Sequence, residues 1–141
     1  MTVIVCLDTG RGMTFFGRRL STDSAVRERI VSLAGSRRLV MNAYTASQFR
    51  GSGADIYVTC DLSSLGDDDV CFAEDFDPSV FKDKISSLVI FRWNRKYPRD
   101  GEMSFYPYDE GMRLDSIRDF AGSSHERITE EIWTRTEDYD K

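Results

Sequence analysis

Residues typical of catalytic and metal-binding sites are few in this chain, and the presence of only one histidine limits the possible sites most. His125 has no second histidine at HxH or HExxH spacing, and the cysteines form no CxxC pair. This pattern disfavours a zinc hydrolase, and no metal site is predicted. The sequence also contains neither a G-x-S-x-G turn nor a phosphate-binding P-loop. We interpret His125 as an exposed residue near a helix start or as a hydrogen-bonded partner of another side chain.

Asp23 is the residue whose position most favours a direct chemical role. A carboxylate at the beginning of a helix is normally stabilised by the helix dipole and caps the helix. If the carboxylate opened into a partly apolar cleft instead, it would orient a hydrogen-bonding heterocycle or assist its protonation. The residues alone leave both roles open.

The net charge and the cysteine content of the chain limit the partners it can bind and the compartment in which it can lie. A formal net charge of -5 gives no general attraction for nucleic acid, so none is expected as a partner. The apolar stretch 1–8 is too short to cross a membrane, and no membrane association is predicted. The three cysteines are an odd number without a recognisable signal peptide, which predicts reduced thiols and a cytoplasmic location.

Hydrophobic periodicity predicts one α/β domain over residues 1–141 with a mixed sheet. A helix is predicted from about residue 23 to residue 34, capped by Ser21 or Thr22 and closed by Gly35. Residues 10–13 are predicted to form a loop, residues 44–49 a helical turn, and a short helix is expected to begin at Pro78. Strands are predicted at residues 3–7, 39–41, 55–60, 70–73 and 88–93, with closing antiparallel strands at 112–120 and 128–133.

The segment after residue 125 carries two conflicting signals. Ser123-Ser124-His125-Glu126 is typical of a capping box, which favours a helix over residues 126–135. A family resemblance, given next, favours a strand there, and we follow the resemblance.

Several short motifs follow one another over about residues 2–135. They are Gly12-Met13 in the first loop, Leu20-Ser21-Thr22-Asp23 at the first helix, Leu39 to Thr45 with Phe49 after it, the strand 88–93 with Asp100 and Phe105, and Ser124-His125 before Glu130 to Arg135. Each motif is weak alone, but in their order and spacing they resemble the motifs of the dihydrofolate reductase family.

The resemblance implies a dihydrofolate-reductase-like three-layer sandwich with a central mixed β-sheet. It matches Asp23 to the catalytic carboxylate that binds the pterin ring and aids its protonation, and Met13 to the mobile loop that closes over the site. It assigns substrate contacts to Ile4, Met13, Ile30 and Phe91. The resemblance also assigns cofactor contacts to Thr45 and Asn42.

Departures from the family pattern fall mainly on the cofactor side. Asn42-Ala43 stands where the family has the Gly-Arg pair that holds the NADPH phosphates. Residues 71–75, with Glu74 and Asp75, replace a Gly-Gly, and their bulk and negative charge should repel phosphates. Ser21 replaces a proline beside the catalytic carboxylate, and Phe91 replaces a threonine that supports it. NADPH is the cofactor that the resemblance implies, and these residues argue against it.

Three functional hypotheses remain at this stage. The favoured one is a divergent descendant that binds a small ligand or a protein partner, for example through the run Arg92 to Tyr97, and is not an efficient NADPH-dependent reductase. The alternative is an NADPH-dependent reductase of dihydrofolate or a related pterin, with Asp23 as the proton-assisting carboxylate. An unrelated enzyme, such as an RNA-processing metallohydrolase, is disfavoured by the single histidine.

Overall fold

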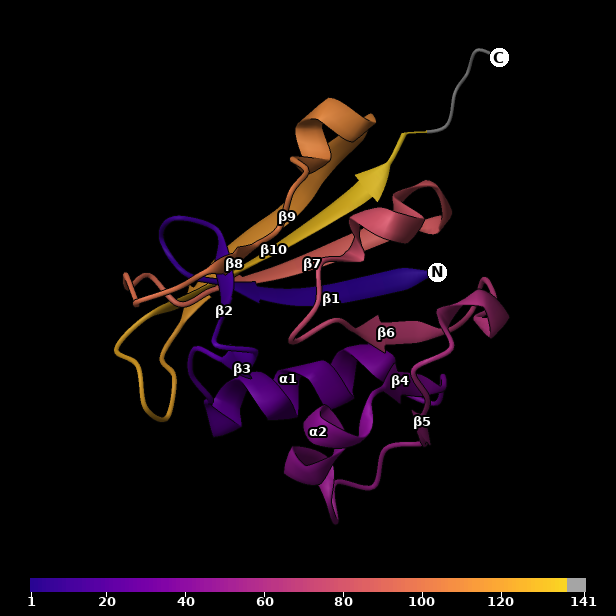
Figure 1. Ribbon diagram of the computed structural model, residues 1–141, viewed down its shortest axis with the longest axis horizontal. Coiled ribbons are helices and arrows are strands. Elements are labelled where there is room, and N and C mark those ends of the chain that lie inside the picture. The colour runs from indigo at the N-terminus through magenta and orange to yellow at the C-terminus, as the bar shows by residue number, and fades with distance from the viewer. Residues whose placement is uncertain (137–141) are drawn as a thin grey trace.

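Short runs of β-branched and aromatic residues form a seven-stranded mixed sheet at the centre of the molecule (Figure 1). The computed structural model describes residues 1–136. The predicted domain, residues 1–141, therefore extends beyond the described residues. In spatial order the strands are β5 (Ile56–Val58), β4 (Leu39–Met41), β6 (Val70–Phe72), β1 (Thr2–Leu7), β7 (Ser87–Arg92), β10 (Ile128–Arg135) and β9 (Met112–Phe120).

Strand β1 lies in the middle of this sheet and pairs in parallel with β6 and β7. Strands β7, β10 and β9 then pair antiparallel, which confirms the predicted closing strands. The conflict over residues 126–135 is thus decided for the strand. Pairing explains the outcome: Glu131 lies opposite Ile90, and its carboxylate accepts 2.7 Å from Nε of Arg92 on β7. Such cross-strand contacts outweigh the local capping signal, whose contribution is about 1 kcal/mol.

The two faces of the sheet bury separate cores, as the alternation within β1 requires. Val3, Val5 and Leu7 face one core, while Ile4 and Cys6 face the other. The first core is covered by the 3₁₀ segment η3 (Pro78–Lys84), the predicted short helix, and by residues around 103–112. The second is covered by α1 (Ser24–Ala34), α2 (Ala43–Ala46) and the 3₁₀ segment η1 (Ser47–Phe49). No helix in residues 1–136 is long and apolar enough to cross a membrane.

Helix α1 begins one residue later than expected, and its cap differs from the prediction. Asp23 is the N-cap: its backbone is extended, and its carboxylate accepts 2.9 Å from the Ala25 N–H. The predicted caps Ser21 and Thr22 both precede it. Gly35 ends the helix as predicted, with a left-handed φ of 58°.

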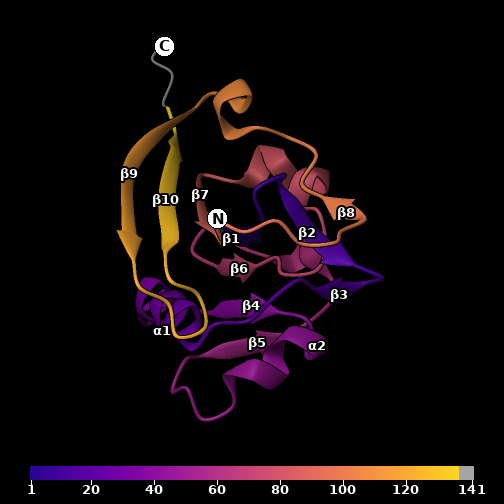
Figure 2. The same cartoon turned by 90° about the vertical axis from the view of Figure 1, so that its left-hand side faces the viewer.

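The predicted loop 10–13 is wrong in its second half, because Gly12 begins a strand. Strands β2 (Gly12–Phe15), β3 (Arg18–Arg19) and β8 (Gly101–Glu102) form a small antiparallel sheet. It follows the carboxyl end of β1, at one end of the large sheet (Figures 1 and 2). Its third strand comes from a polar segment far along the chain, so the local sequence did not signal this pairing. The remaining 3₁₀ segments are η2 (Leu62–Ser64) and η4 (Pro107–Glu110).

Candidate functional site

The carboxylate of Asp23 lies buried at the head of α1 and receives five hydrogen-bond donors. Oδ1 accepts from the N–H groups of Ala25 and Ser123, both at 2.9 Å. Oδ2 accepts from Ser124 N–H at 2.8 Å, Ser124 Oγ at 3.1 Å and His125 Nδ1 at 3.1 Å. Burial alone would raise the pKa of Asp23, but these hydrogen bonds outweigh it and hold the pKa well below its ordinary value. Asp23 therefore fastens the loop between β9 and β10 to α1 as an ionised carboxylate.

His125 belongs to that loop, and its side chain is 2 % exposed. Its ring stacks on Trp93, with the centroids 4.6 Å apart and the planes inclined by 22°. The prediction of a hydrogen-bonded partner is confirmed, and the exposed alternative is wrong. A loop of small residues places the ring: Gly122 lies so close to Asp23 and Ile128 that a Cβ there would overlap the Asp23 carboxylate.

The second ring nitrogen of His125 faces two hydroxyl groups. Nε2 lies 2.8 Å from the Tyr97 hydroxyl and 3.2 Å from Ser21 Oγ. Because the Asp23 carboxylate can only accept, Nδ1 carries a proton, and in the neutral imidazole Nε2 is then the acceptor for these hydroxyls. Ser21 and Tyr97 are both half-buried, so the hydroxyl side of the ring lies nearer to solvent than the carboxylate side. The arrangement makes His125 an oriented base.

A second buried carboxylate, Glu74, follows β6 on the same side of the sheet as α2. It accepts from Nε of Arg19 at 2.6 Å, from Oγ1 of Thr45 at 2.8 Å and from Nε2 of Gln48 at 2.8 Å. The hydroxyl of Thr45, a predicted cofactor contact, thus donates to a protein carboxylate. Arg19 also lies with its guanidinium 4.0 Å from the centroid of the Tyr44 ring.

Asn42, the other predicted cofactor residue, caps α2. Its Oδ1 accepts from the Thr45 N–H at 2.9 Å, and its Nδ2 donates to Asp75 at 2.9 Å. Asn42 and Thr45 therefore bond to each other at the point where β4 and β6 end, and their assignment as cofactor contacts stays a prediction. Every polar atom of the Asn42 side chain has a protein partner there.

Three of the predicted substrate residues meet in one cluster. Ile4, Ile30 and Phe91 are fully buried together between α1 and the sheet. Ile30 also lines a narrow deep pocket near Asp23. Met13 does not join them, because β2 turns it into the core on the opposite face.

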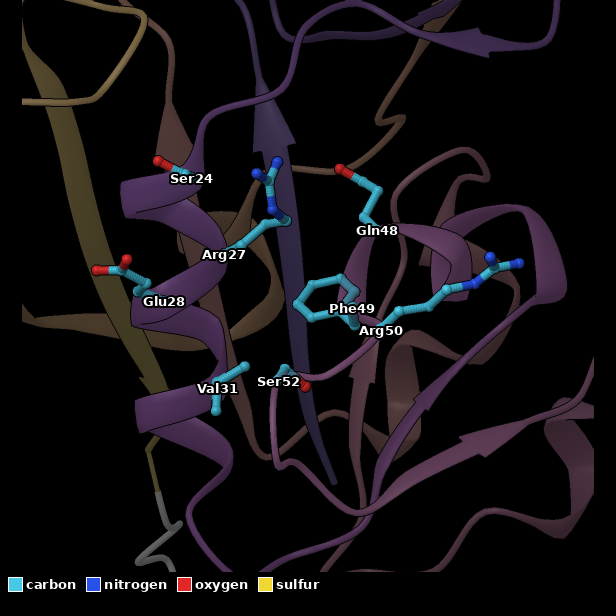
Figure 3. Close-up of a pocket in the computed structure, with 8 residues that line it drawn as sticks. All are labelled: Ser24, Arg27, Glu28, Val31, Gln48, Phe49, Arg50 and Ser52. Atoms are coloured by element: carbon cyan, nitrogen blue, oxygen red, sulfur yellow. The ribbon is translucent and has the colours of Figure 1, made fainter.

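A groove runs between α1 and η1, with a volume of about 410 Å³ (Figure 3). Arg27 on α1 and Gln48 on η1 face one another across it, the ring of Phe49 lies below the gap between them in this view, and Glu28 points away. Arg27 and Gln48 also line the deep pocket, together with Ser21 and Asp23. The groove and the deep pocket therefore adjoin at these two residues, and the deep pocket is small, with a volume of about 10 Å³, enough for about one water molecule. Among residues 1–136, Arg29 of α1 pairs with Glu130, but Arg27 forms no ion pair.

The cationic run 92–97 is used mainly for internal contacts. Arg92 pairs with Glu131 at 2.7 Å, and Trp93 is buried against His125. Only Arg95 and Lys96 remain as exposed cations of this run.

The sequence analysis missed Asp8, a fully buried carboxylate at the end of β1. It accepts from the N–H groups of Gly10, Gly12 and Tyr97, at 2.9, 2.7 and 3.1 Å. It thereby ties the first loop to the segment that holds Tyr97. An aspartate directly after an apolar strand and before Thr-Gly is a turn signal that could have identified it.

The fold is that of the dihydrofolate reductases. The chain is similar in structure to the dihydrofolate reductase from Enterococcus faecalis in complex with NADP(H) and RAB-propyl, with a TM-score of 0.67 over 97% of both chains and a sequence identity of 8%. No protein-family model matches the sequence, and no curated protein matches it either. At this identity the likeness establishes the dihydrofolate-reductase-like fold and carries no activity.

Proposed function

We propose that this protein binds a small organic anion with an aromatic or apolar part in the cleft between α1 and η1, and that it does so without NADPH. The observation that carries the proposal is Arg27, a half-buried residue that lines the cleft and has no ion-pair partner among residues 1–136. A guanidinium that lines a groove without a counter-ion favours an anionic ligand.

The remaining lining of the groove suits such a ligand. Phe49 and Val31 supply apolar surface, and Gln48 and Ser52 supply polar atoms. Phe49 is held in place by an edge-to-face contact with Phe72, at a centroid distance of 6.0 Å. The volume of about 410 Å³ lies within the range of small-molecule sites. A small molecule is therefore the partner we propose, rather than nucleic acid or a membrane surface, for which a net charge of -5 offers little attraction.

The residues around Glu74 do not fit the phosphates of NADPH. Phosphate sites present N–H groups and unpaired cations to the ligand. Here a buried carboxylate takes the hydroxyl of Thr45, and the nearest cation, Arg19, is already paired with it. Asp75, bonded to Asn42, adds a second negative charge.

The alternative is an NADPH-dependent pterin reductase with Asp23 as the proton-assisting carboxylate. It is favoured by the likeness to a reductase solved with NADP(H) and by the position of Asp23 beside the deep pocket. The hydrogen bonds of Asp23 weigh against it, since both carboxylate oxygens are engaged with protein donors.

The test compares two ligands that differ in charge. ¹⁵N–¹H spectra of the protein are recorded with benzoate and with benzamide, each up to about 10 mM, a range suited to fragments of this size. Benzoate should shift the signals of Arg27 Nε and the Phe49 amide, and benzamide should shift them much less. Arg27→Gln should abolish the benzoate shifts, whereas Arg37→Gln, three residues beyond the C-terminal end of α1, should not.

A parallel titration with NADPH follows the fluorescence of Trp93 and Trp133. No saturation up to about 1 mM, equivalent to binding weaker than about -4 kcal/mol, is expected. Micromolar NADPH binding, together with turnover of dihydrofolate, would overturn the proposal in favour of the reductase. Equal response to benzoate and benzamide would remove the role assigned to Arg27.

A further inference from the structure

Three side chains at the head of α1 lie in the order of a nucleophile, a base and the group that orients the base. Ser21 Oγ is 3.2 Å from His125 Nε2, and His125 Nδ1 is 3.1 Å from Asp23 Oδ2. The Asp23 and His125 side chains are 0 % and 2 % exposed, whereas Ser21 is only half-buried. Such triads are recognised by geometry and not by a fixed sequence motif.

We propose that Ser21 is the nucleophile of an ester-hydrolysing site, with His125 as its general base and Asp23 as a positioning residue. This inference rests on the proposed function, because Ser21 and Arg27 line the same small pocket, whose volume of about 10 Å³ has to widen before an ester reaches Ser21 Oγ. Arg27 lies four residues beyond Asp23, just over one helical turn or roughly 6 Å along α1. The substrate class is a carboxylic ester that carries an anionic group several bonds from the scissile carbonyl.

His125 meets the geometric requirements of a general base. Its Nδ1–H is directed to a carboxylate that cannot donate, so Nε2 keeps its lone pair for a hydroxyl proton. The stack on Trp93 and the bond to Asp23 fix the plane and the rotation of the ring. Both contacts come from elements distant in sequence, so the orientation is a property of the folded chain.

Tyr97 shares the same nitrogen. Its hydroxyl lies 2.8 Å from Nε2, closer than Ser21 Oγ. A neutral imidazole nitrogen has one lone pair, so the two hydroxyls compete for it. Removing the Tyr97 hydroxyl leaves Ser21 as the only donor of the pair, and Tyr97→Phe is therefore expected to preserve or increase the reactivity of Ser21.

The chemical step is a balanced acyl transfer. Ser21 Oγ forms a bond to the ester carbonyl carbon while its proton passes to His125 Nε2. The bond from that carbon to the alkoxy oxygen then breaks, and the Nε2 proton goes to the leaving alcohol. Water, deprotonated in turn by Nε2, hydrolyses the acyl-serine and releases a carboxylic acid and free Ser21.

The first experiment uses a fluorophosphonate, which labels activated serines independently of ligand preference. Intact-mass analysis should show one adduct per chain, mapped to Ser21, in the wild type and in Tyr97→Phe. Ser21→Ala should show none, and Ser32→Ala, an exposed serine on α1, should label as the wild type does. Absence of an adduct in folded wild-type protein, or an adduct at another serine, overturns the proposal.

The second experiment measures hydrolysis of mono-4-nitrophenyl succinate against 4-nitrophenyl butyrate, an anionic and a neutral ester of similar length. Ser21→Ala should lower both rates at least about 100-fold. Arg27→Gln should lower only the rate with the succinate ester. Labelling of Ser21 without a preference for the anionic ester supports the triad and overturns the role of Arg27. Binding of benzoate without labelling of Ser21 supports the role of Arg27 and overturns the triad.

The positioning role of Asp23 has a spectroscopic readout. Side-chain ¹⁵N shifts of His125 should report the tautomer with the proton on Nδ1 in the wild type. The tautomer with the proton on Nε2 would overturn the proposal, because that nitrogen could not accept the Ser21 proton.

Discussion

Replacing Asp23 by asparagine tests the network at the head of α1 most directly, because asparagine keeps the shape of the side chain and one acceptor oxygen. In the wild type, each carboxylate oxygen accepts from at least two donors. The asparagine amide has only one oxygen, so its NH₂ group must face donors in either orientation. If the oxygen serves Ala25 and Ser123, the NH₂ faces Ser124 N–H and His125 Nδ1.

The size of the effect follows from counting these contacts. One partly buried backbone N–H, that of Ser124, loses its acceptor, which costs about 1–2 kcal/mol. The contacts that survive change from a charged to a neutral acceptor, which weakens them by roughly 1 kcal/mol in all. The helix also loses part of the dipole interaction at its first turn, about 0.5 kcal/mol. We therefore expect Asp23→Asn to lower the free energy of unfolding by about 3 kcal/mol at pH 7.

Urea unfolding followed by tryptophan fluorescence measures this loss. The matched control is Asp61→Asn, because Asp61 also caps a short helical segment but binds only Ser63 nearby. Its urea midpoint should stay close to that of the wild type. A midpoint for Asp23→Asn that equals the wild-type value would refute the argument, since it would mean that the loop bonds to Asp23 contribute nothing.

The same variant predicts a pH dependence. The pKa of Asp23 is lowered in the folded state, so its contribution to stability is complete above the unfolded pKa of about 3.9 and is lost as the pH falls through the folded pKa. Below about pH 4 the gap in stability between the wild type and Asp23→Asn should shrink, because only the wild-type residue becomes protonated.

Two further predictions concern small residues and thiols. Gly122→Ala should lower the free energy of unfolding by about 2–3 kcal/mol, because the new Cβ would overlap the Asp23 carboxylate and lie 2.7 Å from Ile128. The control is Gly66→Ala, whose new Cβ would have no neighbour nearer than 3.9 Å. It should unfold at a urea midpoint near that of the wild type. A thiol reagent at pH 8 should modify one cysteine of the native protein, the exposed Cys60, and all three cysteines in urea. Cys6 and Cys71 are buried in the native protein, and burial raises the pKa of Cys71 to about 12. Fast modification of a second thiol in the native state would contradict this prediction.

The elements that the sequence predicted well are those whose signal is local. Leu88 to Phe91 form an uninterrupted apolar run, and all four are buried in β7. The helix that ends at Gly35 has its buried positions at Val26, Ile30 and Ala34, the spacing of one helical face. Periodicity within a few residues suffices for such elements.

The site was harder to predict because it depends on contacts across the whole chain. His125 looked like part of a capping box, yet it meets residue 23, more than a hundred positions earlier, and the ring of Trp93. The resemblance to a known family placed Asp23 at the head of the helix correctly. It gave no indication that a histidine would occupy the space beside it, because that contact follows from the conformation of the loop at residues 121–127.

The central place of β1 has a consequence for how the chain reaches its fold during synthesis. Thr2 pairs with Val70 on one side and with Ser87 on the other, so β1 is made long before either neighbour exists. Until about residue 92 has left the ribosome, Val3 to Leu7 and the apolar side of α1 lack the strand β7 that completes their cores. Such distant pairings slow folding and leave nascent hydrophobic strands open to association. Truncation of the chain after residue 86 would therefore give an aggregating fragment rather than a smaller folded protein.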